Sequence, residues 1–477
     1  MVNLYNQISL SDTFLECKNT YQNDKPKFLE LLTQNLDLAS LIPQTFYWSY
    51  NKTLGRDRKY SLPSMLAALI LQKILGIPTV SLLRLFLILC REAREFCGLN
   101  DIPDNSQFTR FKQDFIPDIE AFFYHLVDIT EPLCREIDSN LASKIAFDTS
   151  GIEAYVTENN PKFLNSIIRK LKRAYKNNPD VDVYKMAYGL MPSSASANKD
   201  VKQLFINGYF CYVYKFSIIT NGLGIVRHIS FLDDQFKSKH PEIELDKKSD
   251  SPDEDKSISD SKSLKPVLTD FFALHPDFHY DTFLGDSIFD SYSTYPMLMD
   301  DFNFKKVLIP LNTRNSSTGL AAPGFNEAGW PLCPLDDSKT LKPLGWTREK
   351  GRSDRFKWGC PDTHYEGTKL VCHCPNPCTD KPSGRMFYTA SGQNRRMYPG
   401  IIRDSDEWLS EYKIRVNVEK NIQYFKDPMG CGNPKTRDNL TIKADLLLAG
   451  ITQMLTVVLA DKIKQPSCLR SIRKLIA

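Results

Sequence analysis

One stretch near the C-terminal end, residues 411–426, constrains this chain more than any other. It spaces Tyr412, Arg415, Glu419 and Lys426 by three, four and seven residues. An α-helix advances about 100° per residue, so these four positions fall within roughly 60° of arc and form one stripe. A carboxylate, two cations and an aromatic hydroxyl on one stripe suit the binding of a metal beside a phosphodiester. The alternative is a solvent-exposed amphipathic helix with ordinary ion pairs.

Length and composition indicate the class of protein. The chain has 477 residues, a length typical of about three domains, and 42% are hydrophobic, enough to build real cores. The net charge is only +4, so any surface for nucleic acid must be local. Residues 1–10 are polar and do not read as a signal peptide, and the apolar run 65–89 is broken by Lys73, Pro78 and Arg84. We therefore expect no membrane span and a cytoplasmic, nucleoid-associated protein, in whose reducing environment clustered cysteines favour metal over disulfides.

Residues 1–140 read as an all-helical domain. Apolar residues recur at three- and four-residue spacing in 26–41 and 62–89, and Asp104 to Ser106 offer cap residues for a further helix. Basic side chains that suit DNA phosphates lie between and after these segments: Arg56, Arg58, Lys59, Arg110 and Lys112. The alternative is a plain helical domain with a solvated basic face.

Two aspartates follow short apolar runs. Asp148 ends the run 144–147, and Asp286 follows Tyr280 to Gly285. A strand that ends in Asp and a turn delivers a carboxylate to the edge of a sheet, although most such Asp residues are caps or turn formers. Asp290 is a weaker rival, expected one helical turn beyond Asp286.

The stretch between the two aspartates predicts a hairpin, a basic helix and a loop. Runs 209–219 and 224–232 flank an Asn-Gly turn signal and predict a β-hairpin. Residues 235–264 are rich in Lys, Asp, Glu and Ser and predict a mobile loop. The predicted helix 161–178 is the densest basic patch, and either contacts DNA backbone or is simply solvated; its cations include Arg169, Lys170, Lys172 and Arg173.

Residues 313–399 form a predicted insertion with three Trp, namely Trp330, Trp346 and Trp358. They either hold a small core or stack on a flipped base. Four thiols in 19 residues suit a structural zinc site, with buried free thiols as the alternative; these are Cys360, Cys372, Cys374 and Cys378.

The Tyr-x2-Arg-x3-Glu-x6-Lys spacing, together with the two Asp contexts, resembles the signature of DDE-class insertion-sequence transposases of the YREK group. The resemblance covers roughly residues 50–450. It implies an α/β fold: an RNase H-like mixed sheet with flanking helices, preceded by an all-helical N-terminal domain and interrupted by the Cys- and Trp-containing insertion. The expected domains are residues 1–140, which bind DNA, 141–312 and 400–477, which form the two parts of the catalytic core, and 313–399, the insertion.

The resemblance also implies chemistry. Asp148, Asp286 and Glu419 would be catalytic and would hold two Mg²⁺ or Mn²⁺ ions, while Tyr412, Arg415 and Lys426 would contact the phosphates of a cleaved DNA end. The expected partners are double-stranded transposon ends and target DNA, bound by a homodimer. Two alternatives stay open: a catalytically silent, transposase-derived DNA-binding protein, and an RNase H-like nuclease.

Overall fold

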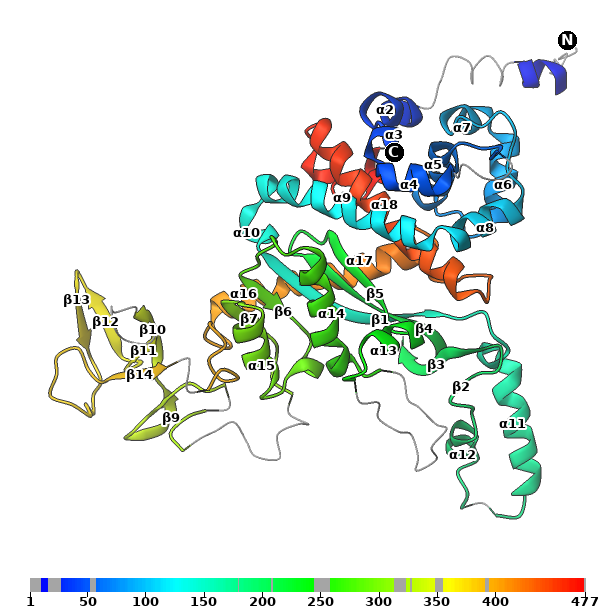
Figure 1. The fold of residues 1–477 in the computed structure, drawn as a ribbon. Helices are drawn as coiled ribbons and strands as arrows, with labels where there is room; N and C mark the ends of the chain where they lie inside the picture. Colours follow the sequence, from blue (N-terminus) through cyan, green and yellow to red (C-terminus); the bar gives the residue numbers. More distant parts are fainter. Residues whose placement is uncertain are drawn as a thin grey trace, which may run out of the picture.

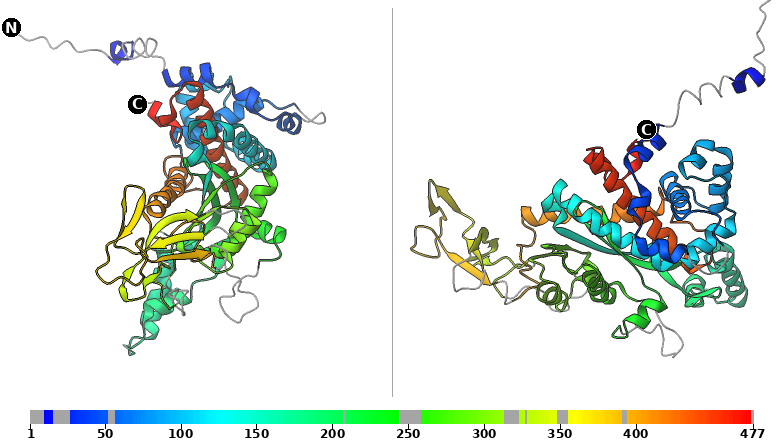
Figure 2. Two further views of the ribbon diagram at one scale, coloured as in Figure 1. Left: turned by 90° about the vertical axis from the view of Figure 1, so that its left-hand side faces the viewer. Right: turned by 45° about the horizontal axis from the view of Figure 1, so that its top comes forward.

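The computed structural model shows a mixed α/β protein in which a helical region lies over one face of a curled sheet (Figure 1). The structure describes residues 10–15, 27–51, 57–178, 180–206, 209–243, 258–312, 323–326, 328–347, 355–390 and 394–475. Two parts project from opposite ends of the sheet in Figure 1 and in the right-hand view of Figure 2: the arm of α11 (Pro161–Ala174) and α12 (Val183–Gly189), and the insertion that follows β7 (Lys306–Leu308).

The N-terminal region is helical, as the apolar spacing predicts. Its predicted second helix is divided, because the chain bends by 100° after Gly76, which has a φ of 64° and caps the first half. Asp104 forms the expected cap, accepting from the Gln107 N–H in a capping box. The helices are α2 (Lys27–Asn35), α3 (Leu38–Leu41), α4 (Gln44–Tyr50), α5 (Leu62–Leu75), α6 (Val80–Leu89), α7 (Arg91–Phe96), α8 (Asn105–Asp114), α9 (Ile116–Ile137) and α10 (Ser139–Ala142).

The central sheet has seven strands. Strand β4 pairs antiparallel with β1, and β6 and β7 extend the sheet parallel to β1. The predicted hairpin is present, since β5 pairs antiparallel with β4. A second hairpin, β2–β3, was not predicted, and its strand β3 pairs with the N-terminal part of β4. The strands are β1 (Lys144–Glu153), β2 (Ser194–Ala195), β3 (Asn198–Ile206), β4 (Tyr209–Asn221), β5 (Val226–Phe231), β6 (Thr282–Leu284) and β7 (Lys306–Leu308).

Helices cover both faces of this sheet, and side chains alternate between two cores. Ile145 and Phe147 of β1 belong to the core shared with α14 (Asp260–Leu274), whereas Ala146 belongs to the core shared with α9, α17 (Val416–Lys426) and α18 (Asn439–Lys462). Successive side chains of a strand point to opposite faces, so Asp148, two residues after Ala146, lies on the face of α17.

Helix α18 packs against α5, α8, α9 and β5, which joins the C-terminal part of the chain to the N-terminal helices. Among the described helices it alone is long and apolar enough to cross a membrane, and 94% of its most apolar window is buried. The apolar composition of α18 is therefore explained by its packing inside the protein.

The predicted loop 235–264 is partly helical, which corrects the prediction. Its ends belong to α13 (Asp234–Lys239) and α14, because Phe236 and Leu264 bury apolar side chains in the core. Residues 244–257 lie outside the described residues. The helix expected after Asp286 consists of short pieces: η2 (Ser287–Phe289), α15 (Thr294–Pro296) and the π-helical turn η3 (Met297–Asp301).

The insertion leaves and rejoins the core at one place, since the Val307 N–H donates to the Pro399 carbonyl over 2.9 Å. Trp358 is fully buried, and Trp330 packs against it with ring centroids 5.7 Å apart, so both hold a small core rather than offering a stacking surface. The side chain of Trp346 lies outside the described residues. The strands are β8 (Leu332–Cys333), β9 (Asp336–Thr340), β10 (Lys342–Thr347), β11 (Arg355–Gly359), β12 (Thr363–Glu366), β13 (Lys369–Cys372) and β14 (Met386–Ala390).

Candidate active site and DNA-binding surfaces

Asp148 and Asp286 occupy equivalent positions on neighbouring strands. Ala146 of β1 pairs with Leu284 of β6 in parallel register, and each aspartate stands two residues further along. Parallel strands in register bring equivalent positions side by side. Two carboxylates that are 138 residues apart in sequence are thereby brought side by side. The predicted strand end at Asp148 is wrong, since β1 continues to Glu153 along β4, and only its parallel pairing with β6 stops before the aspartate.

The two aspartates also share a local geometry. Oδ1 of Asp148 accepts from the N–H of Thr149 at 2.9 Å, and Oδ1 of Asp286 accepts from the N–H of Ser287 at 2.7 Å. Each carboxylate is therefore oriented by the backbone of the next residue. Its second oxygen, Oδ2, remains directed toward Arg415 in both cases.

Glu419 reaches this site from α17, which two amides fix to the turn between β4 and β5. Asn417 donates to the Gly222 carbonyl at 2.8 Å, and Asn421 donates to the Gly224 carbonyl at 2.9 Å. These bonds set the position of the helix against the sheet, and with it the position of the Glu419 carboxylate.

The Arg415 guanidinium joins all three carboxylates. Its Nη1 lies 2.5 Å from Glu419 Oε1, and its Nη2 lies 3.5 Å from Asp148 Oδ2 and 3.9 Å from Asp286 Oδ2. The predicted catalytic trio therefore converges in the structure, with a cation at its centre. Burial raises the pKa of Asp148 to about 6, opposed by the charge of Arg415 and the Thr149 N–H and reinforced by the charges of Glu419 and Asp286.

The stripe of residues 412–426 is present without a single continuous α-helix. Tyr412 ends α16 (Asp406–Tyr412), and Arg415 closes a 3₁₀ turn (Lys413–Arg415) that leads into α17. Lys426, at the end of α17, donates to Ser150 Oγ at 2.7 Å and so reaches β1 close to Asp148. The Tyr412 ring stacks on Trp408 with centroids 4.8 Å apart. All four predicted side chains thus lie along the edge where the carboxylates meet.

Asp290 is not part of this cluster. It is fully buried and forms a two-pronged ion pair with Arg396, whose Nε lies 2.9 Å from Oδ1 and whose Nη2 lies 2.5 Å from Oδ2. Although burial opposes it, the hydrogen bond from Arg396 holds the pKa of Asp290 below its usual range. Asp290 is a structural residue that ties the end of the insertion to the core.

Three of the basic residues predicted for the helical region line one pocket of about 250 Å³, namely Arg58, Lys59 and Arg110. Arg58 is oriented by its hydrogen bond to the Tyr50 carbonyl at 2.7 Å. Arg56 lies outside the described residues.

The prediction for Lys112 is wrong. Its side chain is 1% exposed, and its ammonium lies 2.7 Å from Asp445 Oδ1, an oxygen that Lys73 also contacts at 2.7 Å. Lys112 is a core residue, because α8 turns this position toward α18.

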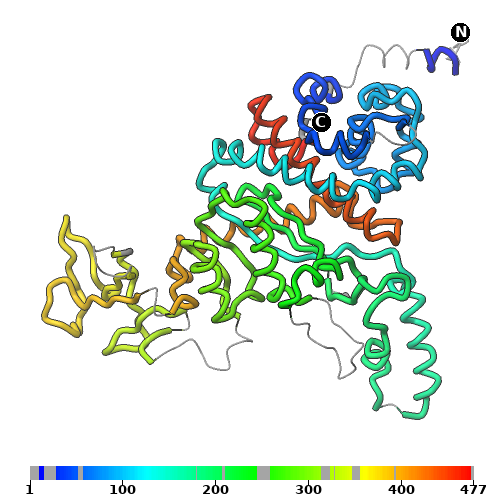
Figure 3. Tube along the Cα trace, viewed as in Figure 1, coloured from blue at the N-terminus to red at the C-terminus, as the bar shows by residue number. Residues whose placement is uncertain are grey.

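The basic helix α11 projects from the sheet as part of the arm (Figure 3). None of its residues is buried. Lys172 lies over the ring of Tyr184 in α12, 4.9 Å from the centroid, which couples the two helices. The four cations predicted on this helix are exposed: Arg169, Lys170, Lys172 and Arg173.

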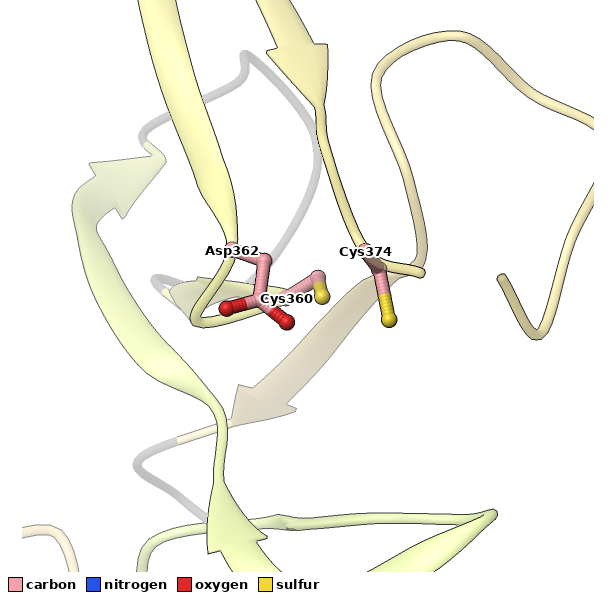
Figure 4. Close-up of side chains that lie close together, drawn as sticks. All are labelled: Cys360, Asp362 and Cys374. Atoms are coloured by element: carbon pink, nitrogen blue, oxygen red, sulfur yellow. The ribbon is translucent and has the colours of Figure 1, made fainter. Parts of the chain in front are cut away.

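The predicted zinc ligands are only partly brought together. Among the described residues, one ligand atom each from Cys360, Asp362 and Cys374 lies within 4.8 Å of the others (Figure 4). Cys372 and Cys378 are not in this group, and Asp362 was not predicted, because the sequence pattern pointed to the four clustered thiols.

Comparison with known proteins adds one match. Residues 16–114 match a family model described as a transposase domain (DUF772). No curated protein matches the chain. The matched part contains α2 to α8, including the pocket residues Arg58, Lys59 and Arg110. In its helical N-terminal part the chain is similar to a transposase domain family, which supports a role as a transposase.

Proposed function

We propose that this protein is a DDE-class transposase that cleaves and transfers the ends of an insertion sequence. The convergence of Asp148, Asp286 and Glu419 on Arg415 carries the proposal. The transposase-domain match in the helical region supports it independently, because that match involves none of these four residues.

The strand arrangement supports an RNase H-like core. Three antiparallel strands, β5, β4 and β1, are followed by two strands parallel to β1, with α14 between β5 and β6. Helices lie on both faces, and the third carboxylate comes from α17 after the insertion. This is the order that the sequence resemblance implies, with the β2–β3 hairpin and the α11–α12 arm added between β1 and β4.

The trio fits hard divalent cations. All its donors are carboxylate oxygens, which Mg²⁺ and Mn²⁺ prefer over thiolates. The close approach of Arg415 to three carboxylates indicates a site that requires positive charge. Asp148, Asp286 and Glu419 would hold the ions, which when bound would supply activation of a water or 3′-hydroxyl and stabilisation of the leaving oxygen.

The remaining residues would bind and orient DNA. The Arg415 guanidinium can exchange carboxylate oxygens for phosphate oxygens, since both suit its planar fork. Lys426 and Tyr412 lie along the same edge and would contact the phosphates of the cleaved end. The pocket of Arg58, Lys59 and Arg110 and the arm of α11 offer further phosphate contacts away from the trio.

Cleavage of the element's own DNA ends tests the proposal. Labelled duplexes that span both boundaries of the encoding element would be incubated with the full chain and Mg²⁺. We expect strand cleavage at the boundaries, lost in Glu419→Gln and Asp286→Asn while DNA binding persists. Asp281→Asn is the matched control, because this exposed carboxylate lies at the opposite end of β6 from Asp286 and pairs with the exposed Lys305 at 2.7 Å.

Other outcomes identify the alternatives. Boundary-specific binding without cleavage by the unmodified chain would indicate a catalytically silent DNA-binding protein. Metal-dependent cleavage without preference for the boundary would indicate an RNase H-like nuclease. Cleavage that survives Glu419→Gln would exclude the DDE assignment.

A further inference from the structure

The β12–β13 hairpin lacks an apolar core of its own. Of its eight strand residues only Thr363 is buried, and Tyr365 is 69% exposed. The small core of the insertion contains no residue of 363–385; its members are Leu341, Phe356 and Trp358 of β11, Met397, Tyr398 and Ile402, with Trp330 and Phe387 of β14 packed against them. An isolated two-stranded hairpin is marginal in water, so this one needs another source of stability.

A cluster of metal-binding side chains lies at the base of this hairpin. Cys360 and Asp362 come from the turn that joins β11 to β12, and Cys374 follows β13. Figure 4 shows the two thiols and the carboxylate close together, and their ligand atoms lie within 4.8 Å of one another. Two segments that are separated by the whole hairpin therefore present ligands to one point.

Asp362 Oδ2 provides a second, independent observation. It is buried and has no hydrogen-bond partner. Its ion-pair partner is the partly exposed Lys339, whose ammonium lies 3.6 Å away. A buried carboxylate oxygen without a hydrogen bond is costly, and a coordinated metal would satisfy it.

The backbone around the cluster is fixed. The Thr363 N–H donates to the Cys360 carbonyl at 3.1 Å, and the His373 N–H donates to the Asp362 carbonyl at 2.9 Å. The Cys372 thiol interacts with that of Cys360, so a third sulfur adjoins one member of the group, although Cys372 lies outside the set whose ligand atoms are all within 4.8 Å of one another. Three thiols and one carboxylate form a four-ligand set that zinc accepts in tetrahedral sites.

We propose that Cys360, Asp362, Cys374 and Cys372 bind one structural Zn²⁺ that fastens the β12–β13 hairpin to β11. The sequence pattern favours Cys378 as the fourth ligand, but the proposed site has Asp362 in its place. The ion has no part in phosphodiester chemistry, since a closed, thiolate-rich site leaves no open position for substrate. Its effect is on the folding of residues 360–385.

Metal analysis of the purified full chain tests the proposal. The protein would be expressed with added zinc, purified in reductant and measured by elemental mass spectrometry. We expect about one zinc per chain, falling at least about fivefold in Cys360→Ser and in Cys374→Ser. Cys378→Ser is the matched control and should retain the metal. An unmodified chain without zinc, or a Cys360→Ser/Cys374→Ser double variant that keeps it, would overturn the site.

Cobalt replacement identifies the ligands without relying on the variants alone. In the unmodified chain loaded with Co²⁺, we expect the absorption of a tetrahedral thiolate site. Its charge-transfer intensity should fall by about one third in Cys372→Ser, because one of three thiolates is lost. Unchanged intensity would exclude Cys372 as a ligand, and a Cys360–Cys372 disulfide in the unmodified protein would replace the metal site altogether.

Discussion

Arg415 Nη2 lies 3.5 Å from Asp148 Oδ2, and this contact joins the segment that enters α17 to the central strand. The Arg415 side chain is 11% exposed, whereas Asp286 and Glu419 are each 49% exposed. The guanidinium therefore forms the floor of the site, and the two outer carboxylates face solvent. An opposite charge at this distance favours the ionised form of a carboxyl whose pKa burial raises.

Arg415→Gln should lower strand cleavage by about 100-fold or more, because the variant loses the charge that balances the carboxylates and meets phosphate. Single-turnover cleavage of a boundary duplex measures the effect. Lys413→Gln, in the same 3₁₀ turn and exposed, serves as control and should stay within about twofold of the unmodified protein. Equal loss in both variants would show that the effect is not specific to Arg415.

Asp290→Asn should destabilise the protein by about 3–5 kcal/mol, because Arg396 would be left buried without its partner. Urea unfolding measures this loss. Asp300→Asn removes a neighbouring ion pair with Arg395, in which Asp300 is 51% exposed, and should cost less than about 1 kcal/mol. Cleavage per folded molecule should persist in Asp290→Asn. Abolished cleavage with unchanged stability would instead make Asp290 a catalytic carboxylate.

Reversing charge on the arm, in a Lys170→Glu/Arg173→Glu double variant, should weaken DNA binding. The slope of log affinity against log salt should fall by about 2, since each phosphate contact contributes about 0.9. Fluorescence anisotropy over a salt series measures both quantities. The control is Lys265→Glu/Lys305→Glu, which reverses two exposed lysines outside the arm. An equal change in both double variants would indicate a general charge effect and no specific role of the arm.

Lys112 and Arg110 lie two residues apart on α8 and should behave oppositely. Lys112→Met should lower the free energy of unfolding by about 2–4 kcal/mol, because Lys112 pairs with Asp445 in the core. Its DNA affinity per folded molecule should not change. Arg110→Ala should alter stability by no more than about 0.5 kcal/mol and weaken DNA binding, because Arg110 is exposed beside the pocket. Reduced DNA affinity in folded Lys112→Met would contradict this assignment.

His228 predicts acid sensitivity. Burial lowers its pKa to about 3, against an ordinary value of 6.5. Above pH 6.5 the His228 imidazole is neutral in both the folded and the unfolded chain, and its contribution to stability is fully present. Between pH 6.5 and 3 only the unfolded chain binds the proton, so the free energy of unfolding falls as the pH is lowered. From about pH 7.5 to about pH 5 the contribution of His228 amounts to a loss of about 2 kcal/mol. Urea unfolding at both pH values measures it, and His228→Gln should remove that part of the loss.

The sequence allowed the carboxylate edge to be predicted because its parts are local. An apolar run followed by Asp predicts the strands that bring Asp148 and Asp286 to the site, and helical spacing predicts the face of Glu419. The predicted end of the first strand is wrong, because β1 continues beyond Asp148 to Glu153 in pairing with β4. What joins them is not local: the register of Ala146 with Leu284 and the position of Arg415 between the three carboxylates depend on tertiary packing.

Other features could not be predicted because their partners are remote. The pattern of α8 gives no sign that Lys112 meets Asp445, which lies 333 residues away. Similarly, Asp362 resembles any turn aspartate until β12 and β13 pair and bring Cys374 beside it. The bend at Gly76 was foreseeable in part, since Gly76 and Pro78 are helix breakers, but the apolar spacing continues across them.

The insertion leaves and rejoins the core at adjacent points, where the Val307 N–H meets the Pro399 carbonyl. Because the two ends of the insertion are already held together, a change in the number of residues between them has only a small effect on the loop-closure entropy. The edge that carries the three carboxylates is thereby little affected by the length of this segment. The fold can therefore accommodate an insertion of different length or sequence, provided that Arg396 still pairs with Asp290.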